Sequence, residues 1–479
     1  MLTVSLDNRL ETPLYEQLYR YIRGEIETGR LAAGEKLPSK RALCAHLKIS
    51  QNTVETAYEQ LTAEGYLLAR PRSGYYVQRM EAPLRPATPF SPSAVSSVQE
   101  EAPSAETASP PLYDFRTNAV DTDHFPFSVW ARLTREILCE DSRGLLRAVH
   151  PQGDPALRAE IARYLRDYRG ILASPEQIVV GAGSEYLLGL AIQLLGRNRR
   201  YAVENPGYPK TRRIFEGGGA EVVPIRLDED GLRVDGLRRS GADIVHVTPS
   251  HHFPLGTVMP VRRRMELLRW AEEAEGRFIL EDDYDSEFRF AGRPIPALQG
   301  LDRNGRVVYF NTFAKTLAPS LRIGYMVLPE PLLALYQRDF LFYSSTVPSF
   351  EQHVLRRFLQ DGYFERHLSR MRNRYKEKRD RLLEALARHD PGNAVRIRGA
   401  EAGLHLLLQL EGRDEPALTA AAEQAGVRVY GLSGYYAPDG APPPGGMGGV
   451  VLGYAGFPPE QIEEAVALLA AAWGLEETT

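Results

Sequence analysis

The stretch "RVVYFNTFAKTLAPSLRIGYMVLP", residues 306–329, contains two short apolar runs separated by a turn that carries Lys315. Short runs rich in β-branched and aromatic residues predict strands. Comparable runs occur upstream in "QIVVGAGS", "DIVHVTPS" and "RFILEDDYD", and amphipathic helical stretches lie between them. Strands that alternate with helices indicate an α/β domain with a mostly parallel sheet and flanking helices.

The 479 residues of the chain exceed what one hydrophobic core usually supports, so more than one domain is expected. Pro, Ser, Ala and Glu dominate the stretch "APLRPATPFSPSAVSSVQEEAPSAETASPP". Such a composition buries too little apolar surface to offset the entropy of ordering, which is typical of a linker. We therefore expect an N-terminal domain at residues 1–80, a linker at 81–111 and a larger domain at 112–479, which ends in a small α+β lobe.

The composition argues against several classes of protein. No run of about 18 apolar residues occurs, so no membrane span is expected. The N-terminus "MLTVSLDNRL" lacks the basic start and apolar stretch of a secretory signal. Cys44 and Cys139 fit neither a disulfide framework nor a zinc pattern and are expected to be reduced core residues. A cytoplasmic protein is predicted.

The segment before the linker follows a pattern of three helices and two strands. Apolar residues recur every four positions in the first helix, Pro38 and Ser39 favour the start of a second, and Ser50 can cap a third. The predicted inner faces are Leu14, Leu18, Ile22 and Ile26; Leu43 and Leu47; and Val54, Ala57, Tyr58 and Leu61. "YLLARPRSGYYV" then predicts two strands around a tight turn. This succession is typical of a winged helix-turn-helix domain.

A domain of this kind binds double-stranded DNA by placing the first turn of its third helix in the major groove. Here that turn offers Gln51, Asn52 and Thr53, and the amides of the first two can pair with adenine. Contacts with phosphates or the minor groove are predicted for Lys40, Arg41, Lys48, Arg70 and Arg72. The alternative is a helical docking domain, because residues 1–80 contain 11 Lys/Arg and 9 Asp/Glu, a net charge of only +2.

Lys315 alone could be a solvated charge, but further residues of the chain predict a site for pyridoxal 5'-phosphate. This cofactor needs a lysine, a carboxylate at its pyridine nitrogen, an aromatic ring to stack on, a donor to its phenolic oxygen, and amides, hydroxyls and an arginine for its phosphate. Asp282 ends one strand-like run, and "VVGAGSEYLLGL" predicts a strand, a glycine turn and a helix start. The predicted cofactor-binding residues are Gly183, Ser184, Glu185, Tyr208, Asp282, Tyr284, Thr312, Lys315 and Arg322.

Both halves of the chain resemble known families. "KLPSKRALCAHLKISQNTVETAYEQLTAEGYLLARPRSGYYV" resembles the GntR winged-helix family, and "GAGS", "NPGY", "EDDYD" and "TFAKTLAPSLRIGY" resemble fold-type-I aminotransferases over residues 112–475. Together, and with "HPQG" and "TPSHHFPLGTVMP", they resemble the MocR/GabR transcription regulators. That resemblance implies a homodimer, arranged head-to-tail, which carries pyridoxal phosphate on Lys315 as an internal aldimine and senses an amine or amino acid or the cofactor itself.

The chain departs from these families at three places. Gln51 stands where the GntR family usually has arginine, and His252 and Phe253 stand where the enzymes have an asparagine that contacts the phenolic oxygen. The arginine that clamps the carboxylate of an amino acid is replaced at about Gly456. A buried carboxylate without a partner is costly, so ordinary α-amino acids should bind poorly unless another arginine substitutes. Candidates for that substitution are Arg116 and Arg428.

Three functions stay open from the sequence. The chain is expected to be a DNA-binding regulator that senses an amine, or a regulator for which pyridoxal phosphate is the signal. The third interpretation is a working aminotransferase with a fused regulatory DNA-binding domain. No metal is expected, because the ten histidines show no close ligand spacing beyond His251–His252, whose side chains should point apart in an extended segment.

Overall fold

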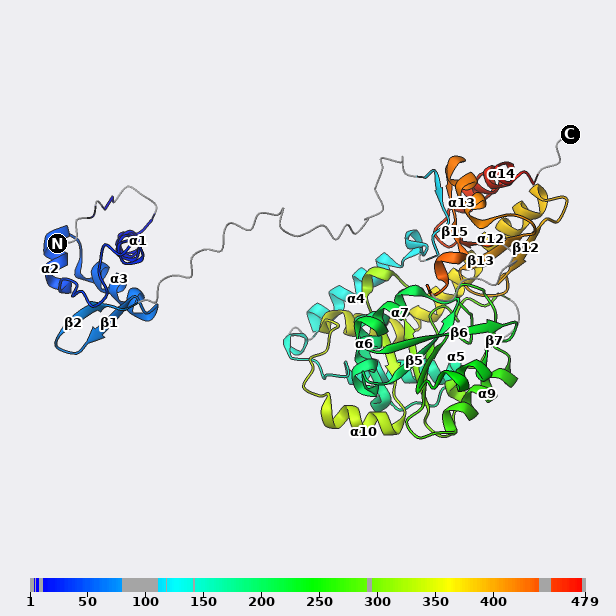
Figure 1. The fold of residues 1–479 in the computed structure, drawn as a ribbon, viewed down its shortest axis with the longest axis horizontal. Helices are drawn as coiled ribbons and strands as arrows, with labels where there is room; N and C mark the ends of the chain where they lie inside the picture. Colours follow the sequence, from blue (N-terminus) through cyan, green and yellow to red (C-terminus); the bar gives the residue numbers. More distant parts are fainter. Residues whose placement is uncertain are drawn as a thin grey trace. The chain divides into compact units, whose positions relative to one another are not determined.

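The computed structural model describes residues 12–79, 111–117, 119–140, 143–290, 295–438 and 449–475, together with Val4, Leu6 and Asp7. The chain divides into two compact units, Met1–Thr107 and Ala108–Thr479 (Figure 1). The predicted linker falls almost entirely outside the described residues. No described helix is long and apolar enough to cross a membrane.

The N-terminal unit has the predicted order of three helices and a hairpin (Figure 1). Its elements are α1 (Leu14–Glu27), α2 (Lys40–Leu47), α3 (Gln51–Ala63), β1 (Leu67–Arg70) and β2 (Gly74–Val77). The predicted inner faces are buried, except that Leu14 and Leu47 are half-buried. The backbone amides of Ala42 and Thr53 donate to the hydroxyls of Ser39 and Ser50, so each serine caps its helix as expected. The winged helix-turn-helix prediction is confirmed.

An eight-stranded sheet with the order β4-β11-β10-β9-β8-β5-β6-β7 forms the centre of the C-terminal unit (Figure 1). Six strands run in one direction, and only β11 and β7 run against them. The strands are β4 (Ile178–Gly181), β5 (Arg200–Asn205), β6 (Glu221–Asp228), β7 (Gly231–Leu232), β8 (Ile244–Val247), β9 (Phe278–Asp282), β10 (Val307–Thr312) and β11 (Gly324–Val327). Each run predicted to be a strand is one.

Helices cover both faces of this sheet, as the packing of β10 illustrates. Val308 and Phe310 pack in one core with α6, α7 and α10, whereas Val307 and Tyr309 face the opposite layer. The helices of the large domain are α4 (Phe127–Glu140), α5 (Pro155–Arg169), α6 (Ser184–Leu195), α7 (Pro209–Gly217), α8 (Val234–Ser240), α9 (Val261–Glu272), α10 (Glu330–Asp339), α11 (Ser349–Gln360) and α12 (Tyr363–His389). The prediction of a mostly parallel sheet with flanking helices is therefore confirmed.

The last part of the chain forms the predicted smaller α+β lobe. Its four-stranded sheet has the order β12-β13-β16-β15, and a short pair joins β14 to β3. The elements are β3 (Tyr113–Asp114), β12 (Val395–Arg398), β13 (His405–Leu410), α13 (Glu415–Gln424), β14 (Val427–Arg428), β15 (Tyr430–Gly431), β16 (Gly449–Gly453) and α14 (Ile462–Trp473). One core cluster joins this lobe to the C-terminal half of α12.

The expectation for the cysteines was wrong for one of them. Both are free thiols, but Cys139 is exposed on α4, while Cys44 is half-buried on α2. Cys139 lies near the end of an amphipathic helix, in which Leu133 and Ile137 face the core. Sequence composition alone does not distinguish the two faces of that last turn.

Candidate functional site

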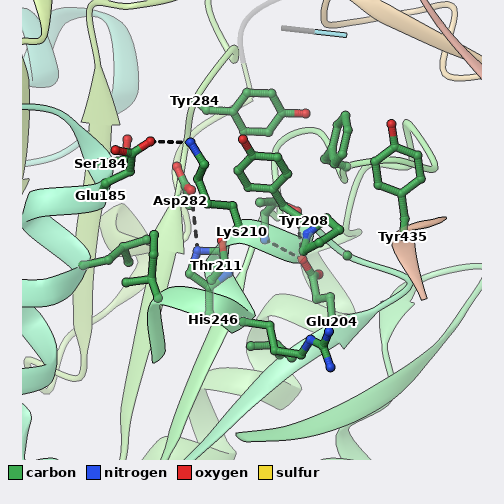
Figure 2. A pocket seen from close by; sticks show the side chains of 18 of the residues that line it. Ser184, Glu185, Glu204, Tyr208, Lys210, Thr211, His246, Asp282, Tyr284 and Tyr435 are labelled. Atoms are coloured by element: carbon green, nitrogen blue, oxygen red, sulfur yellow. Dashed lines mark hydrogen bonds and ion pairs between the residues drawn. The ribbon is translucent and has the colours of Figure 1, made fainter. Parts of the chain in front are cut away.

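A cavity of about 340 Å³ opens in the C-terminal unit where β5, β8, β9 and β10 end and α6 and α7 begin (Figure 2). Open α/β sheets place ligands at the carboxyl ends of their strands, and the volume suits a small cofactor. The nine residues predicted to bind a cofactor all line this cavity: Gly183, Ser184, Glu185, Tyr208, Asp282, Tyr284, Thr312, Lys315 and Arg322. The structure thus brings together residues that span 140 positions of the sequence.

Asp282, the last residue of β9, is directed into the cavity (Figure 2). Its Oδ2 lies 3.5 Å from Nε2 of His246 on β8. Its Oδ1 is buried and finds no hydrogen-bond partner among the described residues. A buried carboxylate oxygen without a partner is costly, so this atom fits a cationic group such as the protonated pyridine nitrogen of pyridoxal phosphate.

Lys315 follows β10 and is largely buried in the cavity wall. Burial disfavours the charged ammonium and lowers the pKa of Lys315 to about 8, against a smaller opposing effect of Asp285. Its Nζ also lies 3.4 Å from the carbonyl oxygen of Thr117. A lysine with a lowered pKa has a larger neutral fraction, and the neutral amine is the form that bonds to a carbonyl carbon.

The start of α6 offers a cradle for an anion. Gly183 adopts φ +88°, and a Cβ on it would lie 3.0 Å from Nη2 of Arg322. The backbone amides at the first turn of a helix and the helix dipole both favour a phosphate at this position. Arg322 also contacts Glu185 at 3.2 Å, and Thr312 Oγ1 donates to the carbonyl of Ile323. A phosphate here would compete with Glu185 for the guanidinium group.

Two tyrosines complete the predicted set. Tyr208 precedes α7, and its ring meets that of Phe253 edge-on, with the centroids 5.6 Å apart. Tyr284 lies two residues beyond Asp282 and is half-buried, and its pKa is raised well above the ordinary value by desolvation and then by the nearby carboxylates. Both tyrosines line the cavity. Because its pKa is raised, the Tyr284 hydroxyl stays protonated and can donate a hydrogen bond.

The cavity also contains residues that sequence reasoning missed. They are Glu204, Lys210, Thr211, Arg212, His246, Tyr435 and Tyr436. Burial raises the pKa of Glu204 to about 7, although Thr248 donates to it twice. Lys210 forms an ion pair of 2.5 Å with Glu185, and Arg212 lies 3.7 Å from Glu216. Glu204 is the last residue but one of β5, the strand next to β8, and its position after an apolar run was the available signal.

The arginines proposed to replace the missing carboxylate clamp do not line the described cavity. Arg116 is largely exposed and pairs with Asp114, and Arg428 pairs with Glu423 at 3.6 Å. Gly456 is exposed just after β16, and a Cβ on it would lie 2.7 Å from that of Ala119. The guanidinium groups that do line the cavity belong to Arg212 and Arg322.

The predicted DNA contacts mostly lie on the surface of the N-terminal unit. Gln51, Asn52, Arg41, Lys48, Arg70 and Arg72 are exposed. Thr53 shares a hydrogen bond with the Ser50 hydroxyl, and Lys40 forms an ion pair with Glu55. The exposed amides at the start of α3 and the arginines of the hairpin therefore remain available, while Lys40 is already neutralised.

Comparison with known proteins matches both units. Residues 110–469 match the family model for aminotransferases of class I and II, and residues 14–77 match that for bacterial regulatory proteins of the gntR family. The chain is 42% identical to the uncharacterized HTH-type transcriptional regulator YdeL of Bacillus subtilis over 98% of this chain and 99% of that protein. It is 36% identical to the probable rhizopine catabolism regulatory protein MocR of Rhizobium meliloti, over 98% and 95%.

Two further similarities extend this picture. The pyridoxine biosynthesis transcriptional regulator PdxR of Corynebacterium glutamicum is 32% identical, with 95% of this chain and 94% of that protein aligned. Among solved structures, the kynurenine aminotransferase of Pyrococcus horikoshii in complex with PMP superposes with a TM-score of 0.66 at 26% identity, covering 78% of this chain and 93% of that one. The similarity to regulators thus spans both units, whereas the match to the aminotransferase family model, at residues 110–469, lies within the C-terminal unit.

Proposed function

Since this chain belongs to the MocR-type HTH transcriptional regulators, in which a GntR-type domain precedes a class I and II aminotransferase domain, we propose that it regulates transcription through a pyridoxal phosphate site. The cofactor is bonded to Lys315, and either an amine or the cofactor itself is the signal. This proposal rests on the observation that Lys315 and Asp282 line the same cavity.

Pyridoxal phosphate, when bound, supplies a carbonyl carbon that amines attack and a ring that withdraws electrons. The residues of this chain account for each part of its binding. Lys315 offers an amine with a lowered pKa, and Asp282 offers a carboxylate oxygen without a protein partner. Tyr284 donates from its hydroxyl, and the amides at the start of α6 receive the phosphate. The loss of any one of these groups should weaken cofactor binding.

The effector class follows from the charges around the cavity. A primary amine is needed to displace Lys315 from the cofactor. The missing clamp at Gly456 argues against ordinary α-amino acids, but Arg212 lines the cavity and its contact with Glu216 is long, at 3.7 Å. An amine whose anionic group can reach Arg212 is therefore the favoured effector.

The DNA-binding unit acts through the exposed first turn of α3 and the hairpin. Gln51 and Asn52 read base edges in the major groove, and Arg70 and Arg72 contact the backbone or the minor groove. A homodimer would present two such units to a two-fold symmetric operator. Light scattering should then give twice the 53.6 kDa mass of one chain, and a monomer at all concentrations would contradict this part of the proposal.

The first experiment is an absorbance titration of the purified protein with pyridoxal phosphate, followed by amines and amino acids. We expect Lys315→Ala to lose the visible absorbance of the lysine-bound cofactor while remaining folded, and Lys376→Ala, an exposed lysine of α12, to keep it. Covalent cofactor retained in Lys315→Ala would reject the assignment.

The titration also separates the alternatives. An amine that changes the spectrum without forming a keto acid identifies an amine sensor. A protein that takes up the cofactor, ignores every amine and changes its DNA affinity with the cofactor has the cofactor as its signal. Repeated turnover with an amino donor and a keto acid would instead support an aminotransferase with a fused regulatory domain.

A further inference from the structure

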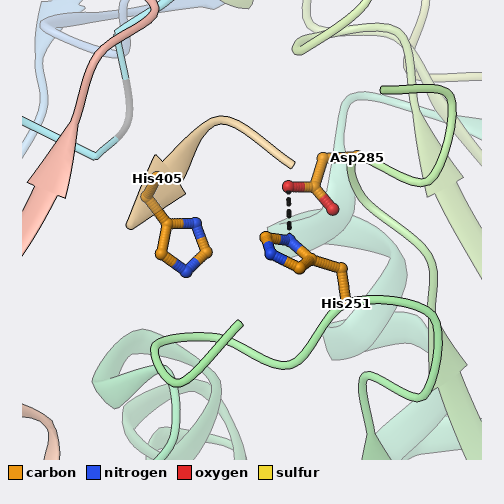
Figure 3. Close-up of side chains that lie close together, drawn as sticks. All are labelled: His251, Asp285 and His405. Atoms are coloured by element: carbon orange, nitrogen blue, oxygen red, sulfur yellow. Dashed lines mark hydrogen bonds and ion pairs between the residues drawn. The ribbon is translucent and has the colours of Figure 1, made fainter. Parts of the chain in front are cut away.

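A second group of buried polar side chains lies next to Tyr284, and none of its three residues lines the cavity. His251 follows β8, Asp285 follows β9, and His405 begins β13; each is only 2% exposed (Figure 3). His251 Nδ1 lies 2.9 Å from Asp285 Oδ2, and the two imidazole rings are 4.7 Å apart between centroids. His405 Nε2 is 3.2 Å from the carbonyl oxygen of Pro254. We refer to these three residues as the His251 cluster.

The cluster meets the residues of the cofactor site at the Tyr284 hydroxyl, which Asp285 also approaches, and at Phe253, whose ring centroid lies 5.0 Å from that of His405. The Tyr284 hydroxyl lies 3.3 Å from the same Nδ1 of His251 that faces Asp285. We propose that His251 and Asp285 are positioning residues that hold the Tyr284 hydroxyl toward the phenolic oxygen of the cofactor. This inference rests on the proposed function, because it assigns a task to residues that do not touch the cofactor themselves.

The C-terminal lobe fixes the imidazole of His251 in place. Gly403 adopts φ +73°, and a Cβ on it would lie 1.9 Å from Cε1 of His251 and 2.6 Å from Oδ2 of Asp285. The backbone of Gly403 is itself anchored, because its amide donates to the Phe288 carbonyl at 2.8 Å and its carbonyl accepts from the Tyr454 hydroxyl at 2.6 Å. A side chain at position 403 would displace the pair, so only glycine allows this packing.

Two imidazoles and a carboxylate could also hold a metal ion, since one ligand atom from each lies within 4.8 Å of the others. The hydrogen-bonded arrangement is favoured because Asp285 Oδ2 is already engaged by His251 and Gly403 packs against that contact. His251 Nε2 is buried with no hydrogen-bond partner among the described residues. That is the lone-pair nitrogen expected when Nδ1 carries the proton and donates to Asp285. The Tyr284 hydroxyl oxygen then accepts from the same shared N–H and keeps its own proton for the cofactor.

The charges around Tyr284 set the expected direction of the effect. Its hydroxyl is faced by Asp282, Glu204 and Asp285, and His251 is in contact with it. His252 and His405 are neutral near pH 7, because burial lowers the pKa of both. A hydroxyl that donates to the phenolic oxygen stabilises the deprotonated cofactor. Loss of its orientation should therefore raise the midpoint pH at which the lysine-bound cofactor changes its absorbance.

The test is a pH titration of that absorbance in the full-length protein loaded with pyridoxal phosphate. We compare wild type, His251→Gln, Asp285→Asn, Tyr284→Phe and the double variant Tyr284→Phe/His251→Gln. One net hydrogen bond corresponds to a shift of about 0.5 to 1 pH unit. Asp390→Asn is the matched control, because Asp390 is a buried carboxylate that accepts two backbone hydrogen bonds at the start of β12.

We expect both single variants to raise the midpoint as Tyr284→Phe does, the double variant to add nothing further, and Asp390→Asn to leave it unchanged. Unshifted midpoints in His251→Gln and Asp285→Asn would overturn the inference, as would additive shifts in the double variant. Stoichiometric zinc in the purified protein, lost in His251→Gln without a shift, would overturn it in favour of a metal site. If Asp285→Asn does not fold, the inference is tested by the double-mutant cycle of His251→Gln and Tyr284→Phe alone. A wild type that takes up no cofactor rejects the proposed function itself, which distinguishes the two failures.

Discussion

At the scale of single residues, burial controls the ionisation of Lys315 and Glu204, whereas pairing with each other controls that of Glu185 and Lys210. Desolvation lowers the pKa of Lys315 to about 8 and raises that of Glu204 to about 7. Both shifts favour the neutral forms. Neutral groups next to an electrophilic cofactor are consistent with a site in which amines exchange, because the attacking amine must be unprotonated.

Glu204→Gln tests the burial of this carboxyl. The folded pKa of about 7 lies above the ordinary value of 4.5, so the protonated form stabilises the fold fully below pH 4.5, and this contribution is lost as pH rises to about 7. Glutamine cannot ionise and can still accept from Thr248. The free energy of unfolding of the variant, relative to that of wild type, should therefore increase by up to about 2 kcal/mol from pH 5 to pH 8.

Urea unfolding of the cofactor-free protein at both pH values measures this difference. Tryptophan fluorescence reports on the C-terminal unit alone, because Trp130, Trp270 and Trp473 all belong to it. Glu229→Gln, at an exposed position, serves as the control. An equal difference between wild type and Glu204→Gln at both pH values would show that Glu204 ionises normally in the folded state.

Arg212→Gln tests the effector class. If Arg212 binds the anionic group of an amino acid, its loss removes a charge-assisted contact worth about 1.5 to 3 kcal/mol, or roughly 10- to 100-fold in affinity. Amines without an anionic group should be unaffected. The measurement is the concentration of each ligand that half-saturates the change in cofactor absorbance, with Arg213→Gln, an exposed neighbour outside the cavity lining, as the control. Equal losses for both kinds of ligand would remove Arg212 from effector recognition.

At the scale of elements, the caps of the N-terminal helices connect stability with DNA binding. Ser50 accepts from the amide of Thr53 and so fixes the first turn of α3, which carries Gln51 and Asn52. Ser50→Ala should cost about 1 kcal/mol of stability and weaken DNA binding as well. Asp154→Ala removes the corresponding cap of α5 in the other unit and should leave DNA affinity unchanged. Fluorescence anisotropy with a duplex selected from genomic DNA measures the DNA affinity of both variants. Equal affinities would show that the Ser50 cap does not contribute to DNA recognition.

Local sequence patterns predicted most elements and the nine cavity residues, because most of those residues lie near the end of an apolar run or the start of a helix. Asp282 and Gly183 are examples, since the strand period or the glycine turn fixes where they lie. The His251 cluster could not be predicted in this way. His251 and His252 do point apart, toward Asp285 and Glu204 respectively, but the approach of His405 depends on how the C-terminal lobe packs against the large domain. A contact over 154 positions leaves no periodic signal in the sequence.

At the scale of the whole molecule, the proposed function requires that the state of the cofactor site changes the affinity for DNA. Any such coupling is reciprocal, so DNA must change the affinity for pyridoxal phosphate by the same factor. Couplings of about 1 to 3 kcal/mol correspond to changes of 5- to 150-fold. This reciprocity provides a test that needs no knowledge of the natural effector.

We therefore expect the affinity for the selected duplex to differ between cofactor-free and cofactor-loaded protein, and the affinity for pyridoxal phosphate to differ by the same factor with and without that duplex. Lys315→Ala should bind the duplex as the cofactor-free wild type does and should not respond to added cofactor, because the bond that distinguishes the two states cannot form. Lys376→Ala should respond as wild type.

Salt must be held constant throughout, since phosphate contacts by residues such as Arg70 and Arg72 make DNA affinity fall steeply with ionic strength. If cofactor does not change the affinity for DNA and DNA does not change the affinity for cofactor, the two units are not coupled. A regulator that senses through Lys315 would then be excluded.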